Sequence, residues 1–171
     1  MSRSFAGSPW QVVLASAAII VLAVDYLMFA LLHVAQYGDR TGVDAYLSEY
    51  QAIPSMGIGS SAELHEWLGL SATVFGVVAA VLFLLGILLW QGVARPGVRI
   101  TATITTVISL IGAFIPLSSG LGATNAVVVE ALLVTILVNL AAVIACLFLW
   151  MPAVRGWINE PAPIRNTWEM S

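Results

Sequence analysis

Acidic and amide side chains stand inside stretches of the sequence that are otherwise apolar. Asp25 lies in the first such stretch, and Glu130 and Asn139 lie in the last one. Charged groups at membrane depth are costly and usually mark functional sites. The sequence has no lysine, and no arginine lies at the same depth, so these carboxyls must be protonated, hydrogen-bonded or in contact with water. We therefore predict an intramembrane polar cluster, formed by Asp25, Glu66, Glu130 and Asn139.

Three interpretations of this cluster stay open. It is a structural hydrogen-bonded network, or it binds a proton, a metal ion or a cofactor, or it engages a polar group of a neighbouring subunit. The sequence contains no nucleophile elbow, no Gly-rich phosphate loop and no His-Glu-x-x-His motif. We therefore expect no catalytic residues and no metal site, and the structural network is the leading interpretation.

The two histidines stand at the boundaries of the first two apolar stretches. His33 ends the first stretch and His65 begins the second, so both lie at one depth, where they could ligate a haem iron axially. The segment Leu64-His-Glu-Trp-Leu-Gly-Leu70 resembles helix starts of membrane b-type cytochromes, in which a His followed by Trp-Leu-Gly carries haem. The resemblance implies haem b on these two histidines. Such families carry further histidines deeper in their helices and this chain has none, so the first expectation is no cofactor.

The composition places all these residues in a membrane protein. Of the 171 residues, 60% are apolar and only 9% are charged, against about 25% charged residues in a soluble domain. Six arginines and a net charge of -3 give no basic stripe to hold nucleic acid. The single cysteine, Cys146, makes no intrachain disulfide. The chain is therefore expected to be one integral membrane domain surrounded by the lipid bilayer.

Four apolar stretches are long enough to cross a bilayer, which takes about 20 residues. They cover residues 10–35, 62–90, 100–117 and 126–150, with a loop at 36–61 and a tail at 151–171. The two later connections are short and force neighbouring helices to run antiparallel. The predicted fold is an all-α membrane protein, an antiparallel four-transmembrane-helix bundle with both termini on one side.

The distribution of arginines predicts the orientation of this bundle. Five arginines fall on the side of the termini, and only Arg40 falls on the other side. The positive-inside rule then places both termini in the cytoplasm of a cell with the chain in its inner or plasma membrane. Four tryptophans mark the same inner boundary: Trp10, Trp90, Trp150 and Trp157.

The first loop contains a candidate surface helix. Apolar residues recur at helical spacing over residues 43–53, which predicts a short amphipathic helix on the outer surface of the bilayer. Ser60 followed by Glu63 then matches a capping box at the start of the second span. We expect that span to begin a turn before the lipid.

Small residues recur every three or four positions in the second and third spans. In lipid, helices associate by close packing and interhelical hydrogen bonds, so such stripes predict helix contacts. The positions expected to pack are Gly69, Gly76, Thr105, Ser109 and Gly112.

Three short motifs give the chain a family resemblance. They are Ser8-Pro-Trp-Gln-Val12, Arg95-Pro-Gly-Val-Arg99 and Pro152-Ala-Val-Arg155-Gly-Trp157. With them the chain resembles small four-helix membrane proteins of unknown function that are common in high-GC Gram-positive bacteria. The resemblance implies a fold and a cellular membrane, and it implies no activity.

The expected function is non-catalytic: an accessory or stabilising subunit that contacts other membrane-protein subunits, or a homo-oligomer. The arguments are the small size, the small-residue stripes and a tail too short to form a domain. The alternative is a small redox protein with haem b, or an ion- or proton-handling protein. That alternative would use the polar cluster together with the two histidines.

Overall fold

The computed structural model describes residues 9–39, 47, 58–91, 93–118 and 126–159. These residues form helices and no strand. The helices are α1 (Trp10–Gly38), α3 (Ser61–Trp90), α4 (Pro96–Ser118), α5 (Ala126–Phe148) and α6 (Pro152–Asn159). The prediction of an all-α bundle is confirmed in its coarser form: three of these helices are long and apolar, and the apolar stretch described in α5 is shorter.

The helix starts follow local sequence signals. Pro9 precedes α1, and its carbonyl accepts from the backbone N–H of Val12 at 2.9 Å. At α3, the Ser60 hydroxyl accepts from the Glu63 N–H at 3.3 Å, and the Glu63 carboxylate accepts from the Gly59 and Ser60 N–H groups at 2.7 and 3.2 Å. The predicted capping box is therefore confirmed. Such a cap contributes about 1 kcal/mol to helix stability.

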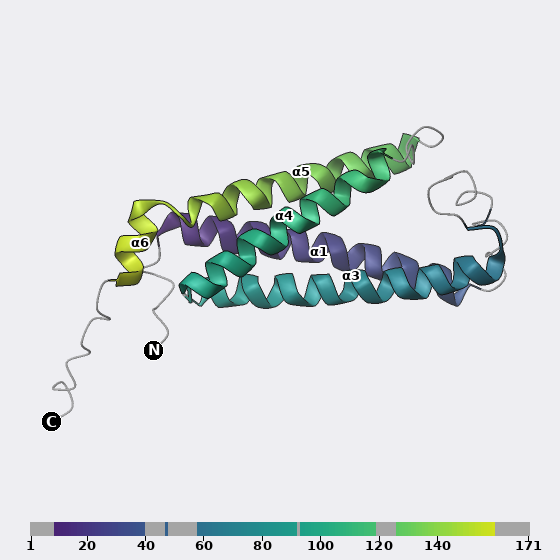
Figure 1. Ribbon diagram of the computed structural model, residues 1–171, viewed down its shortest axis with the longest axis horizontal. Helices are drawn as coiled ribbons and strands as arrows, with labels where there is room; N and C mark the ends of the chain where they lie inside the picture. The colour runs from purple at the N-terminus through teal and green to yellow at the C-terminus, as the bar shows by residue number, and fades with distance from the viewer. Residues whose placement is uncertain (1–8, 40–46, 48–57, 92, 119–125, 160–171) are drawn as a thin grey trace, which may run out of the picture.

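The long helices form an elongated bundle in which α1 and α3 are the closest pair. These two helices contact each other along most of their lengths, α5 packs on α1, and α4 packs on α5. α4 starts beside the end of α3, contacts it little, and diverges from it to run along α5 (Figure 1). The start of α1 and the short α6 lie at the same end of the bundle (Figure 1).

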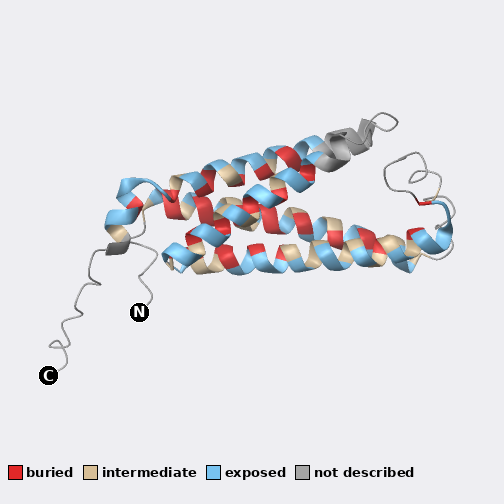
Figure 2. Cartoon of the chain, in the orientation of Figure 1, coloured by how far each residue is buried: buried red, intermediate tan, exposed pale blue. Residues whose placement is uncertain are grey.

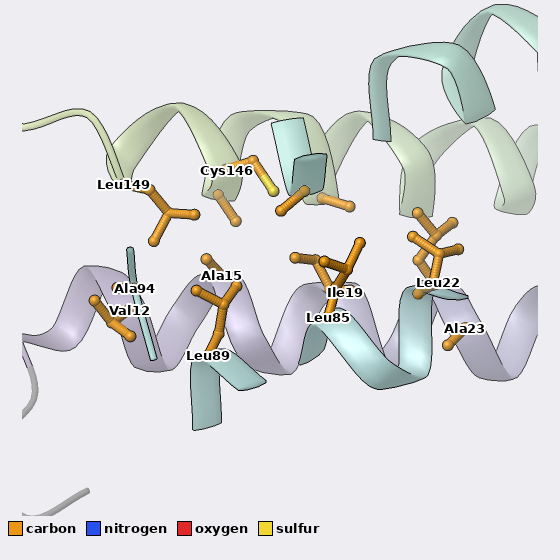
Figure 3. Packing of buried hydrophobic residues seen from close by; sticks show 14 of the residues in the cluster. Val12, Ala15, Ile19, Leu22, Ala23, Leu85, Leu89, Ala94, Cys146 and Leu149 are labelled. Carbon is orange, nitrogen blue, oxygen red and sulfur yellow. The ribbon is translucent and has the colours of Figure 1, made fainter. Parts of the chain in front are cut away.

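The main apolar core lies where α1, α3 and α5 meet. Figure 2 shows the buried positions along the inward faces of the long helices, and Figure 3 shows the core side chains pointing toward one another. On α1 they recur at helical spacing, so one stripe of the helix is buried. The fully buried members include Val12, Ala15, Ile19, Leu22, Leu82, Leu89, Ala142, Cys146 and Leu149.

Most of the remaining surface of the long helices is apolar. α1, α3 and the stretch Pro96–Phe114 of α4 are each long and apolar enough to cross a membrane, and Leu133–Phe148 of α5 is a shorter apolar stretch. Large side chains such as Val24, Met28 and Leu84 are about half exposed or more. A soluble protein does not leave such a continuous apolar surface in water. The chain is an integral membrane protein built of helices.

Small residues bring α1 and α3 together at one position. A Cβ atom added to Gly86 would lie 2.6 Å from Cγ1 of Ile20 and 3.5 Å from the Ser16 carbonyl oxygen. The Ser16 hydroxyl donates to the Gly86 carbonyl at 2.8 Å. At a second position, a Cβ atom added to Gly69 would lie 3.2 Å from Cε2 of the Tyr37 ring. These contacts fix the register of the two helices.

The other expected packing positions differ from each other. Ser109 is buried and its carbonyl accepts from Tyr26 of α1, while Thr105 is half-buried. A Cβ added to Gly76 or Gly112 would meet no atom within 4 Å. Among the described residues, therefore, neither of these two glycines meets a second helix as closely as Gly86 does. α3 and α4 contact each other little over their described residues.

Candidate functional site

Asp25 is the one acidic residue whose side chain the structure describes in the middle of a long helix. It lies on α1, 15 residues after Trp10, which is roughly 22 Å along the helix axis. Its side chain is half-buried, and the Thr135 side chain of α5 is its hydrogen-bond partner. The second carboxylate oxygen, Oδ2, is buried and has no hydrogen-bond partner among the described residues.

Tyr26 follows Asp25 and links α1 to the three other long helices. Its hydroxyl donates to the Ser109 carbonyl of α4 at 3.2 Å, and it lies close to the Asn139 side chain of α5. The ring contacts Phe75 of α3, with 5.9 Å between the centroids. Tyr26 therefore contacts side chains or backbone of each of the other three long helices.

Asn139 is fully buried on α5, one turn after Thr135. Its Nδ2 donates to the Thr135 carbonyl at 2.8 Å, whereas its Oδ1 has no hydrogen-bond partner among the described residues. The phenol of Tyr26 has a single proton, which goes to Ser109, so it cannot also serve Asn139 Oδ1. The sequence-predicted pair Asp25 and Asn139 is thus brought into one cluster by two residues that lie between them.

We call Asp25, Tyr26, Ser109, Thr135 and Asn139 the polar core cluster. Among the described residues, two of its buried acceptor oxygens have no donor, Asp25 Oδ2 and Asn139 Oδ1. An unpaired buried polar atom costs about 1–3 kcal/mol. A proton on Asp25 would turn one of these acceptors into a donor. Among the described residues, the cluster is therefore short of hydrogen-bond donors.

The other members of the predicted site lie apart from this cluster. Glu66 is exposed near the start of α3, and Glu63 serves the helix cap there. The side chain of Glu130 lies outside the described residues, as do residues 43–53 of the predicted surface helix except Leu47. Among the described residues, no three His, Cys, Asp or Glu side chains are grouped to hold a metal ion.

The two histidines have separate aromatic surroundings. The His33 ring is buried, and its Nδ1 lies 2.7 Å from the Phe29 carbonyl oxygen. The centroid of this ring lies 5.4 Å from that of Trp67 and 5.3 Å from that of Phe75. The His65 ring stacks on Tyr37 at 3.8 Å with an interplanar angle of 22°. Each imidazole is thus packed against aromatic side chains of this chain. These contacts give the two rings a packing role at this end of α1 and α3.

Sequence reasoning did not single out Tyr26, Thr135 or Ser16. The available signal was spacing: Thr135 and Asn139 are four residues apart on one face of α5, and Tyr26 directly follows Asp25. Serine and threonine are common in membrane helices, where their hydroxyls often donate to a carbonyl of their own helix. Thr106, for example, donates to the Ala102 carbonyl at 2.9 Å.

The chain has no match among protein-family models, curated proteins or solved structures.

Proposed function

We propose that the chain is a non-catalytic four-span protein of the plasma membrane, with both termini in the cytoplasm, that acts through contacts with other membrane proteins. Its role is that of an accessory or stabilising subunit, or of a homo-oligomer. The observation that supports this proposal is the open space at Gly76 and Gly112, on the two helices that diverge. In α3 itself, the space beside Gly86 is occupied by the Ile20 side chain of α1.

These glycines differ in whether a second helix of the described chain lies against them. Small residues in membrane helices allow backbones to approach, and they gain packing energy only when a second helix occupies the space. At Gly86 the second helix belongs to this chain. At Gly76 and Gly112 the second helix is supplied by a partner.

The experiment compares leucine substitutions in the full chain. Gly86→Leu should destabilise the isolated protein, because the new side chain collides with Ile20. Gly76→Leu and Gly112→Leu should leave its thermal stability in detergent unchanged but reduce crosslinking to its partners in membranes. Val77→Leu and Val107→Leu, at exposed positions nearby, are matched controls. Equal crosslinking for all these variants would contradict the proposal.

The proposed orientation is supported by Arg95, Arg99 and Arg155, which lie at the end of the bundle that holds α6. Reporters fused after residue 171 and within the 93–95 connection should both report cytoplasm, and one near residue 57 should report the exterior. A reporter after residue 171 that reads as external would overturn the orientation.

The polar core cluster supports a second candidate function, the handling of a proton or an ion. The specific observation is that Asp25 Oδ2 and Asn139 Oδ1 are both buried without a donor. A protonated Asp25 has a carboxylic acid C=O stretch in the infrared spectrum, which Asp25→Asn removes. Absence of an Asp25-dependent band would exclude a resident proton there. The haem alternative is tested by the visible spectrum of the purified protein, with His33→Ala and His65→Ala as the variants that should abolish a haem band.

A further inference from the structure

Arg99 is a buried charged residue at the end of the bundle opposite to the histidines. It lies in the first turn of α4 and is only 6% exposed. Its Nη1 donates to the Leu149 carbonyl at 3.2 Å, and its guanidinium carbon lies 5.0 Å from the centre of the Trp150 ring. Its Nε is buried and has no hydrogen-bond partner among the described residues.

The surroundings hold the guanidinium in place without neutralising it. The Trp150 Nε1 donates to the Thr103 hydroxyl at 3.1 Å, and that hydroxyl donates to the Arg99 carbonyl at 2.8 Å. The aromatic ring is thereby fixed against Arg99. A second positive side chain, Arg155 of α6, is near enough to interact electrostatically with Arg99 and is itself exposed.

The nearby helix ends do not supply the missing negative charge. The end of α5 contributes about half a negative charge, and the start of α4, which contains Arg99, contributes about half a positive charge. These partial charges cancel, so among the described residues the two arginines have no compensating negative charge. The described carboxylates lie in the middle of α1 or at the opposite end of the bundle: Asp25, Asp39, Glu63 and Glu66.

The position of this region indicates which anion can reach it. Trp10, Trp90 and Trp150 are each about half exposed near this end of the long helices, and tryptophans of this kind lie at the level of lipid headgroups. A phosphate group accepts hydrogen bonds from two or more N–H groups of one guanidinium at once. The single ammonium of lysine does not offer this planar pair of donors. Basic sites between helices at the cytoplasmic boundary are suited to phospholipid headgroups.

We propose that Arg99 and Arg155 form a binding site for the phosphate of an anionic phospholipid, with Trp150 holding Arg99 in position. Arg155 attracts the headgroup from the exposed side, and Arg99 binds the phosphate from the protein side. The lipid would occupy the seam where the start of α4, the end of α5 and α6 meet.

The test measures lipid binding to the full-length protein in neutral detergent by native mass spectrometry, with phosphatidylglycerol as the probe. Arg155→Gln should weaken binding about fivefold, the effect of one basic residue at a lipid surface. Arg99→Gln should weaken it more. Arg95→Gln is the matched control, because it removes the same charge from an exposed position at the same end and is not among the charges that act on Arg99. It should bind within twofold of the unaltered protein.

Two results would overturn the proposal. One is unchanged binding by Arg155→Gln, a variant of an exposed residue that is expected to fold normally. The other is an equal loss with Arg95→Gln, which would mean attraction by surface charge alone. Inorganic phosphate, added without phosphatidylglycerol, distinguishes the source of the phosphate. A rise in melting temperature equal to that produced by the lipid would assign the site to free phosphate instead.

Discussion

The polar core cluster and the arginine end of the bundle each hold one ionisable side chain with a buried polar atom that has no partner among the described residues, Asp25 Oδ2 and Arg99 Nε. At the core, Asp25 has the neutral side chains of Thr135 and Tyr26 near it, and Tyr26 in turn lies close to Asn139. At the end, Arg99 contacts a carbonyl and a tryptophan ring and has another arginine nearby. The two regions therefore share a deficit of partners but differ in the sign of the buried charge.

This difference decides what can remove each deficit. A carboxylate can lose its charge by taking up one proton, which needs no space and also creates a hydrogen-bond donor. A guanidinium stays protonated in proteins, so only an anion can compensate it. Depth reinforces the distinction, because a proton can reside in the middle of the bundle whereas a phosphate is confined to the membrane surface.

The largest effect is expected for Arg99→Met. This substitution leaves the Leu149 carbonyl without its donor and removes the contact with Trp150. The free energy of unfolding should fall by about 3 kcal/mol, measured by thermal unfolding in detergent with circular dichroism. Arg99→Lys should recover part of the loss, because the ammonium retains the charge and can still donate to a carbonyl. If Arg99→Met were as stable as the unaltered protein, the arginine end would not be a structural contact at all.

The corresponding change in the polar core cluster is Asp25→Leu. It leaves the Thr135 hydroxyl without its partner and should cost about 2 kcal/mol in the same unfolding assay. Asp25→Asn should be at least as stable as the unaltered protein, since its amide supplies a donor to a cluster that has two acceptors without one. A large loss with Asp25→Asn would show that the cluster needs the carboxylate charge.

The two regions also differ in how far the sequence predicts them. The helices follow from long apolar runs, and the α3 cap follows from Ser60 and Glu63, which are three residues apart. Asp25 and Asn139 were expected to share a cluster because polar residues in apolar helices must find partners. The contact of Arg99 with Trp150 was not expected, since each residue has an ordinary role at a membrane boundary and they lie far apart in the sequence.

Helix rotation and register are what the sequence leaves undetermined. Gly76 and Gly86 stand in the same helix, yet only Gly86 faces α1, because Ser16 and Ile20 of α1 meet it there. That meeting depends on residues 70 positions apart in the chain. Small residues therefore identify helices that can approach closely, and the packing of the whole bundle decides which of them do.

A smaller effect is expected for Tyr26→Phe. The phenylalanine keeps the ring contact with Phe75 but loses the hydrogen bond to the Ser109 carbonyl. Side-chain hydrogen bonds between membrane helices contribute about 0.6 kcal/mol on average, so the free energy of unfolding should fall by about that amount. A double substitution with Asp25→Asn tests coupling within the cluster. If the two effects add without interaction, Asp25 and Tyr26 do not share a network.

The smallest effect is expected for Trp150→Phe at the arginine end. Trp150 is about half exposed, so its hydrogen bond to Thr103 competes with water and contributes little to stability. Phenylalanine retains an aromatic face for Arg99, although a weaker one than tryptophan. The free energy of unfolding should therefore change by less than about 0.5 kcal/mol, while phosphatidylglycerol binding should weaken measurably, because Arg99 is less firmly held. A loss of stability as large as that of Arg99→Met would instead mean that the tryptophan is the main structural element of this end and that Arg99 only accompanies it.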